Sequence, residues 1–213
     1  MHLSKDTLKR SRDGVNMGFE IKKTSAMGLS DARGEVFIKV EDGKTGEVLH
    51  DLHLKNVITS DASILAATLF RDPTSRLNGF NMLSVGTGAT GSLLSPDAPD
   101  PAQRKLNSEI ARKAWSTTVF RDAGGNAVAI PTNIVDFTCT FDEGEAVGPL
   151  NEMGIQSTIS NNPLVLNPNP NVYPTRDVTV DLSLYDILGN YLTFSVISVP
   201  ATARFTVTWR ITF

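Results

Sequence analysis

The ten residues 204–213 alternate between large apolar and mostly polar side chains without interruption. The apolar set is Phe205, Val207, Trp209, Ile211 and Phe213, and the other set is Arg204, Thr206, Thr208, Arg210 and Thr212. Because successive side chains of a β-strand point to opposite faces, this period of two predicts a strand with one buried face. Full burial of each large side chain is worth roughly 1.5–3 kcal/mol. We therefore expect this strand to lie inside a sheet.

A second alternating run ends at Phe141 and predicts another half-buried antiparallel strand. Its apolar positions are Val135, Phe137, Cys139 and Phe141, separated by Asp136, Thr138 and Thr140. Cys139 is the only cysteine of the chain, so no internal disulfide can form. Its place among apolar residues predicts a buried, unreactive thiol.

A β-hairpin is predicted at residues 35–56. Residues 35–40 form its first strand, and residues 47–56 return after a turn that contains Gly43 and Gly46. The inner face of the returning strand is expected to carry Val48, Leu52 and Leu54.

Further strands and one helix follow from the remaining patterns. The strands are expected at 82–85, 115–120, 178–185 and 191–199, with Leu188–Asn190 as a turn. Residues 62–71 form the clearest helix, capped by Ser60 or Asp61 and ended by Asp72-Pro73. Its apolar face is Ile64, Leu65, Thr68 and Leu69.

These elements predict a mainly β protein, an antiparallel β-sandwich or jelly-roll-like domain with one short helix. The domain is assigned to residues 34–213. Residues 1–33 are predicted to form an extended N-terminal arm, in which basic residues outnumber acidic ones up to residue 25. The segment 161–174 holds four prolines and five asparagines, which favours an ordered loop or an extended interaction segment over a pair of strands.

The segment Gly86–Gly91 reads G-x-G-x-x-G and follows a predicted strand. A dinucleotide site also needs a helix directly after the glycines, so that its N-terminal amides face the pyrophosphate. Here Pro96, Pro99 and Pro101 prevent a helix, and no P-loop sequence is present. We expect no nucleotide site and interpret the glycines as a tight turn with positive φ.

No catalytic, cofactor-binding or metal-binding residue is assigned from the sequence, and the chain is not expected to be an enzyme. His50 and His53 point to opposite faces of a strand, which argues against a shared zinc ion. The acidic turn with Asp142, Glu143 and Glu145 lacks the ligand spacing of a calcium loop.

Residues 104–112 are ambiguous, because Leu106 and Ile110 fit a helical turn while the same residues also fit an extended segment that leads to Trp115. On an exposed helix, Glu109 and Arg112 would form an ion pair worth about 0.3 kcal/mol.

A set of spaced motifs resembles small structural proteins of tailed bacteriophages. The motifs lie between about residues 34 and 156 and are Lys55-Asn56-Val57-Ile58-Thr59, the helix 64–70, Ser84-Val85-Gly86-Thr87-Gly88, Leu106–Arg112 and Asn151-Glu152-Met153-Gly154-Ile155. The resemblance implies a building block of a virion and carries no catalytic signature.

The expected function is a non-enzymatic component of a tailed-phage particle, associated with the tail, neck or baseplate and assembling through its arm and loops. The first alternative is a capsid decoration (cement) protein, and the second is a glycan-binding or host-surface-binding module. The expected partners are copies of the chain in a cyclic oligomer, with a trimer as the working number, and other virion proteins.

The expected location, from the resemblance, is the virion. Synthesis in the host cytoplasm is expected because the chain shows neither a signal peptide nor an apolar run of about 18 residues. No membrane partner is therefore expected. No direct contact with nucleic acid is expected either, because the net charge is −3.

Overall fold

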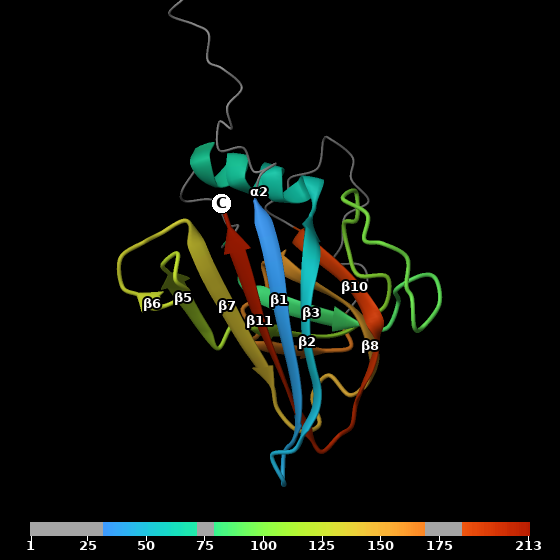
Figure 1. The fold of residues 1–213 in the computed structure, drawn as a ribbon. Coiled ribbons are helices and arrows are strands. Elements are labelled where there is room, and N and C mark those ends of the chain that lie inside the picture. The colour runs from blue at the N-terminus through green and yellow to red at the C-terminus, as the bar shows by residue number, and fades with distance from the viewer. Residues whose placement is uncertain (1–31, 72–78, 169–184) are drawn as a thin grey trace, which may run out of the picture. The chain divides into compact units, whose positions relative to one another are not determined.

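The structure is a computed structural model that describes residues 32–71, 79–168 and 185–213 (Figure 1). Residues 1–31 of the predicted N-terminal arm, residues 178–184 of the predicted strand 178–185, and residues 169–174 of the 161–174 segment lie outside the described residues. Arg33, which was assigned to the arm, is instead the first residue of the first strand.

The described chain forms one antiparallel sheet of eleven strands and one helix. The strands are β1 (Arg33–Asp42), β2 (Val48–Ile58), β3 (Met82–Gly86), β4 (Glu109–Ala114), β5 (Thr117–Arg121), β6 (Ala127–Val128), β7 (Ile134–Phe141), β8 (Gly148–Ser157), β9 (Leu164–Leu166), β10 (Ile187–Val199) and β11 (Ala203–Thr212), and the helix is α2 (Ser60–Arg71). Their order in the sheet is β6-β5-β7-β11-β1-β2-β10-β8-β3-β4-β9. The predicted mainly β, antiparallel fold with one short helix is confirmed.

The sheet curls so that its two halves enclose one core. We call β6, β5, β7, β11, β1 and β2 the first layer, and β10, β8, β3, β4 and β9 the second layer. The layers are joined where Val57 and Ile58 of β2 pair with Tyr191 and Asn190 of β10. The core between them contains residues of both layers, including Ile38, Trp209 and Ile155. The two layers also meet where Trp115, after β4, packs on Phe137 of β7 with 5.3 Å between ring centroids.

The alternation at the end of the chain is confirmed by β11, which lies between β1 and β7. Phe205, Val207, Trp209 and Ile211 are buried. Phe213 was assigned to the same face, but it lies beyond the end of β11 and is 47% exposed. In β7 the alternation is confirmed for Cys139 and Phe141, which are fully buried.

The β1–β2 hairpin is confirmed, with Asp42 ordering its turn by accepting hydrogen bonds from the backbone N–H groups of Lys44 and Thr45. Leu52 and Leu54 pack against the core as predicted. The prediction for Val48 is wrong: a shift in register beside Val40 moves it to the open end of the hairpin, where it is 48% exposed.

β10 differs from its prediction, because Leu188–Asn190 are part of a continuous strand and not a turn. A Cβ atom at Gly189 would lie 2.0 Å from the ring of Phe80, so glycine is needed there for close packing. β9 is a second correction: Leu164–Leu166 of the Pro/Asn-rich segment form an edge strand that pairs with β4.

α2 packs on β10 through Leu65 and Leu69, which contact Ile187 and Phe80. The helix begins at Ser60, so the residue before it is Thr59 and neither predicted cap residue holds that place. The Thr59 hydroxyl instead donates to the carbonyl oxygens of Leu188 and Gly189 at 2.5 and 3.0 Å, which fixes the start of the helix to β10.

Candidate functional site

The glycine loop after β3 lies against the segment before β4. A Cβ atom at Gly86 or at Gly88 would lie 2.4 Å from backbone atoms of Ser108, so both glycines are required by close approach of two backbones. Gly91 alone of the three has a positive φ, at 90°. The predicted turn with positive φ is therefore correct for Gly91 and wrong for the other two.

The same loop is fixed by Glu152, a fully buried residue of β8. One carboxylate oxygen accepts hydrogen bonds from the backbone N–H groups of Gly88 (2.9 Å) and Ser108 (2.7 Å). The other accepts from the Asn107 N–H (3.0 Å) and the Tyr191 hydroxyl (2.7 Å). A buried carboxylate is tolerated only when hydrogen bonds replace its water. We call Glu152 with these four donors the Glu152 clamp.

Asn151 extends the clamp, and Tyr191 remains a donor within it. The side-chain oxygen of Asn151 accepts from the Ala89 N–H at 3.0 Å, so two consecutive residues of β8 hold two consecutive residues of the glycine loop. Burial and the adjacent Glu152 charge raise the pKa of Tyr191 far above its ordinary value, so its hydroxyl remains a donor. The motifs at 84–88, 106–112 and 151–155 are thereby brought together in space.

The clamped loop displays two leucines to solvent. Leu93 is 63% exposed and Leu94 is 80% exposed. Their backbone is nevertheless fixed, because the Leu93 carbonyl oxygen accepts from the Val196 N–H at 2.8 Å and the Leu94 carbonyl oxygen accepts from the Ser195 hydroxyl at 2.7 Å. A third bond joins the Thr193 hydroxyl to the Asp97 carbonyl oxygen at 2.7 Å. We call residues 92–97 the leucine loop.

Glu109 and Arg112 lie in β4, so the extended alternative for this segment is the correct one. The pair is buried, contrary to the exposed pair considered from the sequence. Arg112 binds both carboxylate oxygens of Glu109, at 2.5 and 3.0 Å, and also contacts the buried carboxylate of Asp186 before β10. Burial raises the pKa of Glu109, although the hydrogen bonds from Arg112 act in the opposite direction. This cluster holds β4 against the start of β10.

The acidic turn after β7 binds a cation of the chain itself, the ammonium group of Lys113. The Lys113 ammonium lies 3.0 Å from Asp142 and 2.6 Å from Glu145. Partial burial alone would lower the pKa of Lys113, but the hydrogen bonds to Glu145 and Asp142 outweigh it and raise the pKa. The turn is thus bound by an amine of β4, a strand of the second layer.

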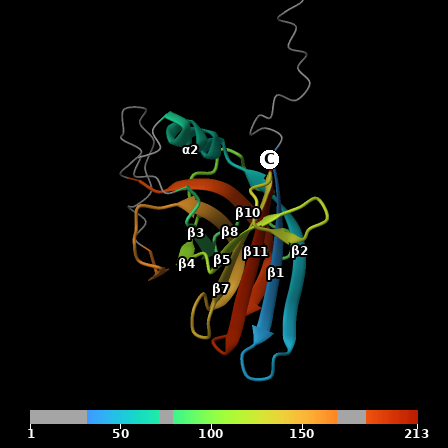
Figure 2. The same ribbon diagram turned by 90° about the vertical axis from the view of Figure 1, so that its left-hand side faces the viewer.

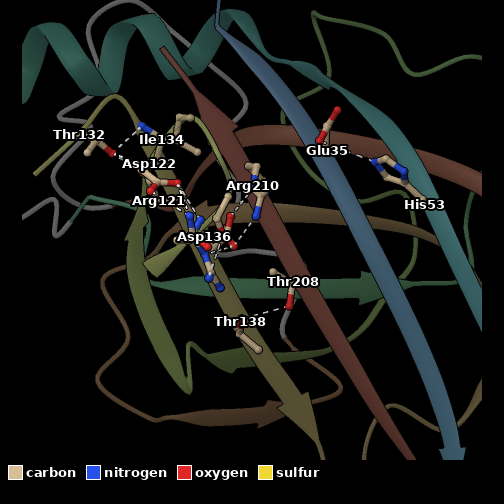
Figure 3. A network of polar contacts seen from close by, with 12 residues as sticks. Glu35, His53, Arg121, Asp122, Thr132, Ile134, Asp136, Thr138, Thr208 and Arg210 are labelled. Atoms are coloured by element: carbon tan, nitrogen blue, oxygen red, sulfur yellow. Dashed lines mark hydrogen bonds and ion pairs between the residues drawn. The ribbon is translucent and has the colours of Figure 1, made fainter. Parts of the chain in front are cut away.

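The outer face of the first layer carries a polar network centred on Asp136 of β7 (Figure 3). This buried carboxylate accepts from Arg121 of β5 at 2.8 Å and from Arg210 of β11 at 2.7 and 2.9 Å. Threonine hydroxyl pairs continue the contact between β7 and β11, Thr138 with Thr208 and Thr140 with Thr206, each at 3.1 Å. The network joins three adjacent strands on the side away from the core.

Asp136→Asn is expected to reduce the pH dependence of stability. Burial alone would raise the pKa of Asp136, but its hydrogen bonds with Arg210 and Arg121 lower the pKa below the ordinary value of 3.8. The stabilisation from this lowered pKa is complete above the unfolded-state pKa and is lost as the pH falls through the folded-state pKa. The melting temperatures of wild type and variant should therefore differ most at pH 7 and converge towards pH 3.

Glu143→Gln is the control for this comparison, because Glu143 is exposed and has no hydrogen bond or ion pair in the described part of the chain. A wild-type minus Asp136→Asn difference that stays constant between pH 7 and pH 3 would contradict the prediction.

The two histidines of β2 lie on opposite faces, as predicted. His50 pairs with the inward Val40, whereas His53 pairs with Phe37 on the outer face, and their rings stack with 4.3 Å between centroids. Cys139 is fully buried, and burial raises the pKa of its thiol to about 12, in agreement with an unreactive thiol. Among the described residues, no group of three or more His, Cys, Asp or Glu side chains is placed to hold a metal ion.

Sequence reasoning missed the two groups that organise these surfaces. Asp136 stands between Val135 and Phe137, and Glu152 lies between Leu150 and Met153 with only Asn151 intervening. A carboxylate in such an apolar stretch was the available signal for a buried acid with a fixed partner. The donors of Glu152 lie 39 to 64 residues away in the sequence, so they could not be read from local spacing. The leucine loop had a weaker signal, two adjacent leucines in a loop rich in proline.

Two comparisons with known proteins find no match: no protein-family model matches the chain, and no curated protein matches it. In the described residues, no helix has the length and the apolar character needed to cross a membrane.

Proposed function

We propose that this chain is a non-enzymatic structural component of a tailed-phage particle, associated with the tail, neck or baseplate, and that the leucine loop contacts a neighbouring virion protein. The observation that carries the proposal is the fixed display of Leu93 and Leu94. An aliphatic pair that is mostly exposed gains free energy when a partner covers it. Because its backbone is already hydrogen-bonded to β10, little conformational entropy is lost on binding.

The motif resemblance supports the same proposal from a different direction. Three of the five motifs that resemble phage structural proteins, at 84–88, 106–112 and 151–155, contribute residues to the Glu152 clamp and the β4 cluster. They therefore serve to hold the leucine loop in place on the second layer. In this proposal copies of the chain also associate with each other in a closed assembly.

Replacing both leucines by serine (Leu93→Ser with Leu94→Ser) is expected to leave the fold intact and to abolish incorporation into particles. The fold should survive because neither side chain belongs to the core. Incorporation would be measured by complementing a deletion of the gene and quantifying the protein in purified particles. Ile130→Ser is the matched control, because Ile130 is 77% exposed at a different site. Equal incorporation of the double variant and the control would contradict the role of the leucine loop.

Gold-labelled antibody against the protein, viewed on particles from the source lysate, tests the location. Label at the tail, neck or baseplate supports the proposal. Label spread over the head would instead favour the capsid decoration alternative. Particles without label would contradict a structural role and favour the glycan-binding alternative.

A further inference from the structure

Most of β2 has an open edge. On one side β2 pairs with β1 from Val48 to Asn56, but on the other side it pairs with β10 only at Val57 and Ile58. No described strand lies beside the second edge between residues 48 and 56. Figure 2 shows β2 at the right of the sheet beside β1, with no strand drawn on the outer side of its lower part. An edge of this length is a template for another strand.

The direction of the backbone groups can be read from the contacts with β10. Val57 pairs with Tyr191, and the Thr59 N–H donates to the Gly189 carbonyl oxygen. In an antiparallel ladder the N–H and C=O of one residue point to the same side, and alternate residues point to opposite sides. Asp51, His53 and Lys55 therefore direct six backbone polar groups to the open edge, and none of these groups has a hydrogen-bond partner in the described part of the chain.

We propose that the open edge of β2 pairs with the same edge of a second copy, in antiparallel orientation about a two-fold axis at His53. In this register residue 51 lies opposite residue 55 of the partner copy, so all three outward residues of each copy form hydrogen-bonded pairs. The contact is isologous, and the strand-addition mode supplies backbone hydrogen bonds. The first layers of the two copies become one continuous sheet.

Charge complementarity selects this register. Charged side chains on an edge strand usually keep other strands away. Here Asp51 and Lys55, which form no ion pair in the described residues, face each other twice across the axis. A register shifted by two residues in one direction places Asp51 opposite His53 of the partner copy, and Lys55 opposite the bulged Leu49. A shift in the other direction places Asp51 opposite Val57, whose backbone is already paired with Tyr191.

The side chains on the core-facing side of β2 are consistent with the same register. Leu52 and Leu54 are only partly buried against the core. In the proposed pair Leu52 lies opposite Leu54 of the second copy, and Leu54 lies opposite Leu52. Apolar cross-strand pairs of this kind stabilise a sheet, so the second copy covers apolar surface that the single chain leaves partly open.

This inference shares with the proposed function the premise that copies of the chain associate. In a larger closed assembly the two-fold pair would be the repeating unit. Because the tests below use purified full-length chain, their failure would remove this interface without deciding whether the protein is incorporated into particles.

Asp51→Lys should weaken the dimer about tenfold in sedimentation velocity across a concentration series, because it places Lys opposite Lys55 twice. The double exchange Asp51→Lys with Lys55→Asp restores opposite charges and should return the dissociation constant to the wild-type value. Glu143→Lys makes the same change of charge away from the edge and should have no effect. A monomeric wild type, or a double exchange no stronger than the single variant, would overturn the proposal.

His53→Cys tests the register directly. Residues that form a hydrogen-bonded antiparallel pair have Cα atoms about 5.5 Å apart, within the range of a disulfide. Oxidation should convert this variant to a covalent dimer on a non-reducing gel, whereas Asp51→Cys, whose symmetric mate is four residues away along the strand, should remain monomeric. The native Cys139 is fully buried and gives no background. Equal cross-linking of the two variants, or none in either, would contradict the two-fold pairing.

Discussion

Deletion of residues 205–213 is expected to yield insoluble protein. β11 lies between β1 and β7, so its loss leaves both of these strands without the partner that they share. It also removes Phe205, Val207, Trp209 and Ile211 from the core. At roughly 1.5–3 kcal/mol for each side chain, the lost burial is about 6–12 kcal/mol, which is comparable to the whole stability of an ordinary domain.

Phe213→Ser is the control for this deletion, because Phe213 lies outside β11 and is largely exposed. This variant should remain soluble and melt within a few degrees of wild type. The measurement is the soluble fraction after expression, followed by thermal unfolding. A truncated chain that is soluble and melts cooperatively would show that β11 is dispensable.

Glu152→Ala is expected to lower the melting temperature by about 6–12 °C. The substitution leaves three backbone N–H groups and the Tyr191 hydroxyl without their acceptor inside the protein. Each unsatisfied buried donor costs about 1–3 kcal/mol, and partial relaxation makes the sum smaller than four separate losses. A net loss of about 3 kcal/mol corresponds to this shift for a chain of about 200 residues.

Two further variants make the Glu152 result specific. Glu152→Gln keeps one carbonyl oxygen as an acceptor for Gly88 and Ser108, so its melting temperature should fall between wild type and Glu152→Ala. Glu143→Ala removes an exposed carboxylate and should change stability by less than about 0.5 kcal/mol. Limited proteolysis should cleave residues 86–108 faster in Glu152→Ala only. Unchanged melting and cleavage in that variant would show that the clamp does not hold the loop.

The parts of the fold that were predictable are those with a local signal. The alternation in 204–213 and 135–141 identified β11 and β7, because half-buried antiparallel strands leave a period of two in the sequence. The turn at Asp42–Gly46 and the helix predicted at 62–71, which corresponds to α2, also follow from interactions between residues close in the sequence. The start of the helix was placed less well, since Thr59 bonds to β10, which is distant in the sequence.

The parts that were not predictable depend on partners far along the chain. Gly189 looked like a turn residue, but it is there because Phe80 packs against its backbone. The leucines of β9 follow Pro163 in a loop-like composition, and only their pairing with β4 makes them a strand. The burial of Glu109 and Arg112 likewise requires Asp186 of another segment. Close approach and buried charge are set by tertiary contacts, which local spacing does not encode.

The position of β11 also determines when the protein can fold during its synthesis. β1 and β11 are neighbours in the sheet, yet their residues 33–42 and 203–212 are separated by most of the chain. The centre of the first layer therefore cannot close until the ribosome has released residue 212. Pairings this distant slow folding, and strands with unsatisfied edges are prone to aggregate in the meantime. Until then β1 and β7 each have an edge that lacks its partner β11. The expression rate and the supply of chaperones should therefore determine the yield of folded protein.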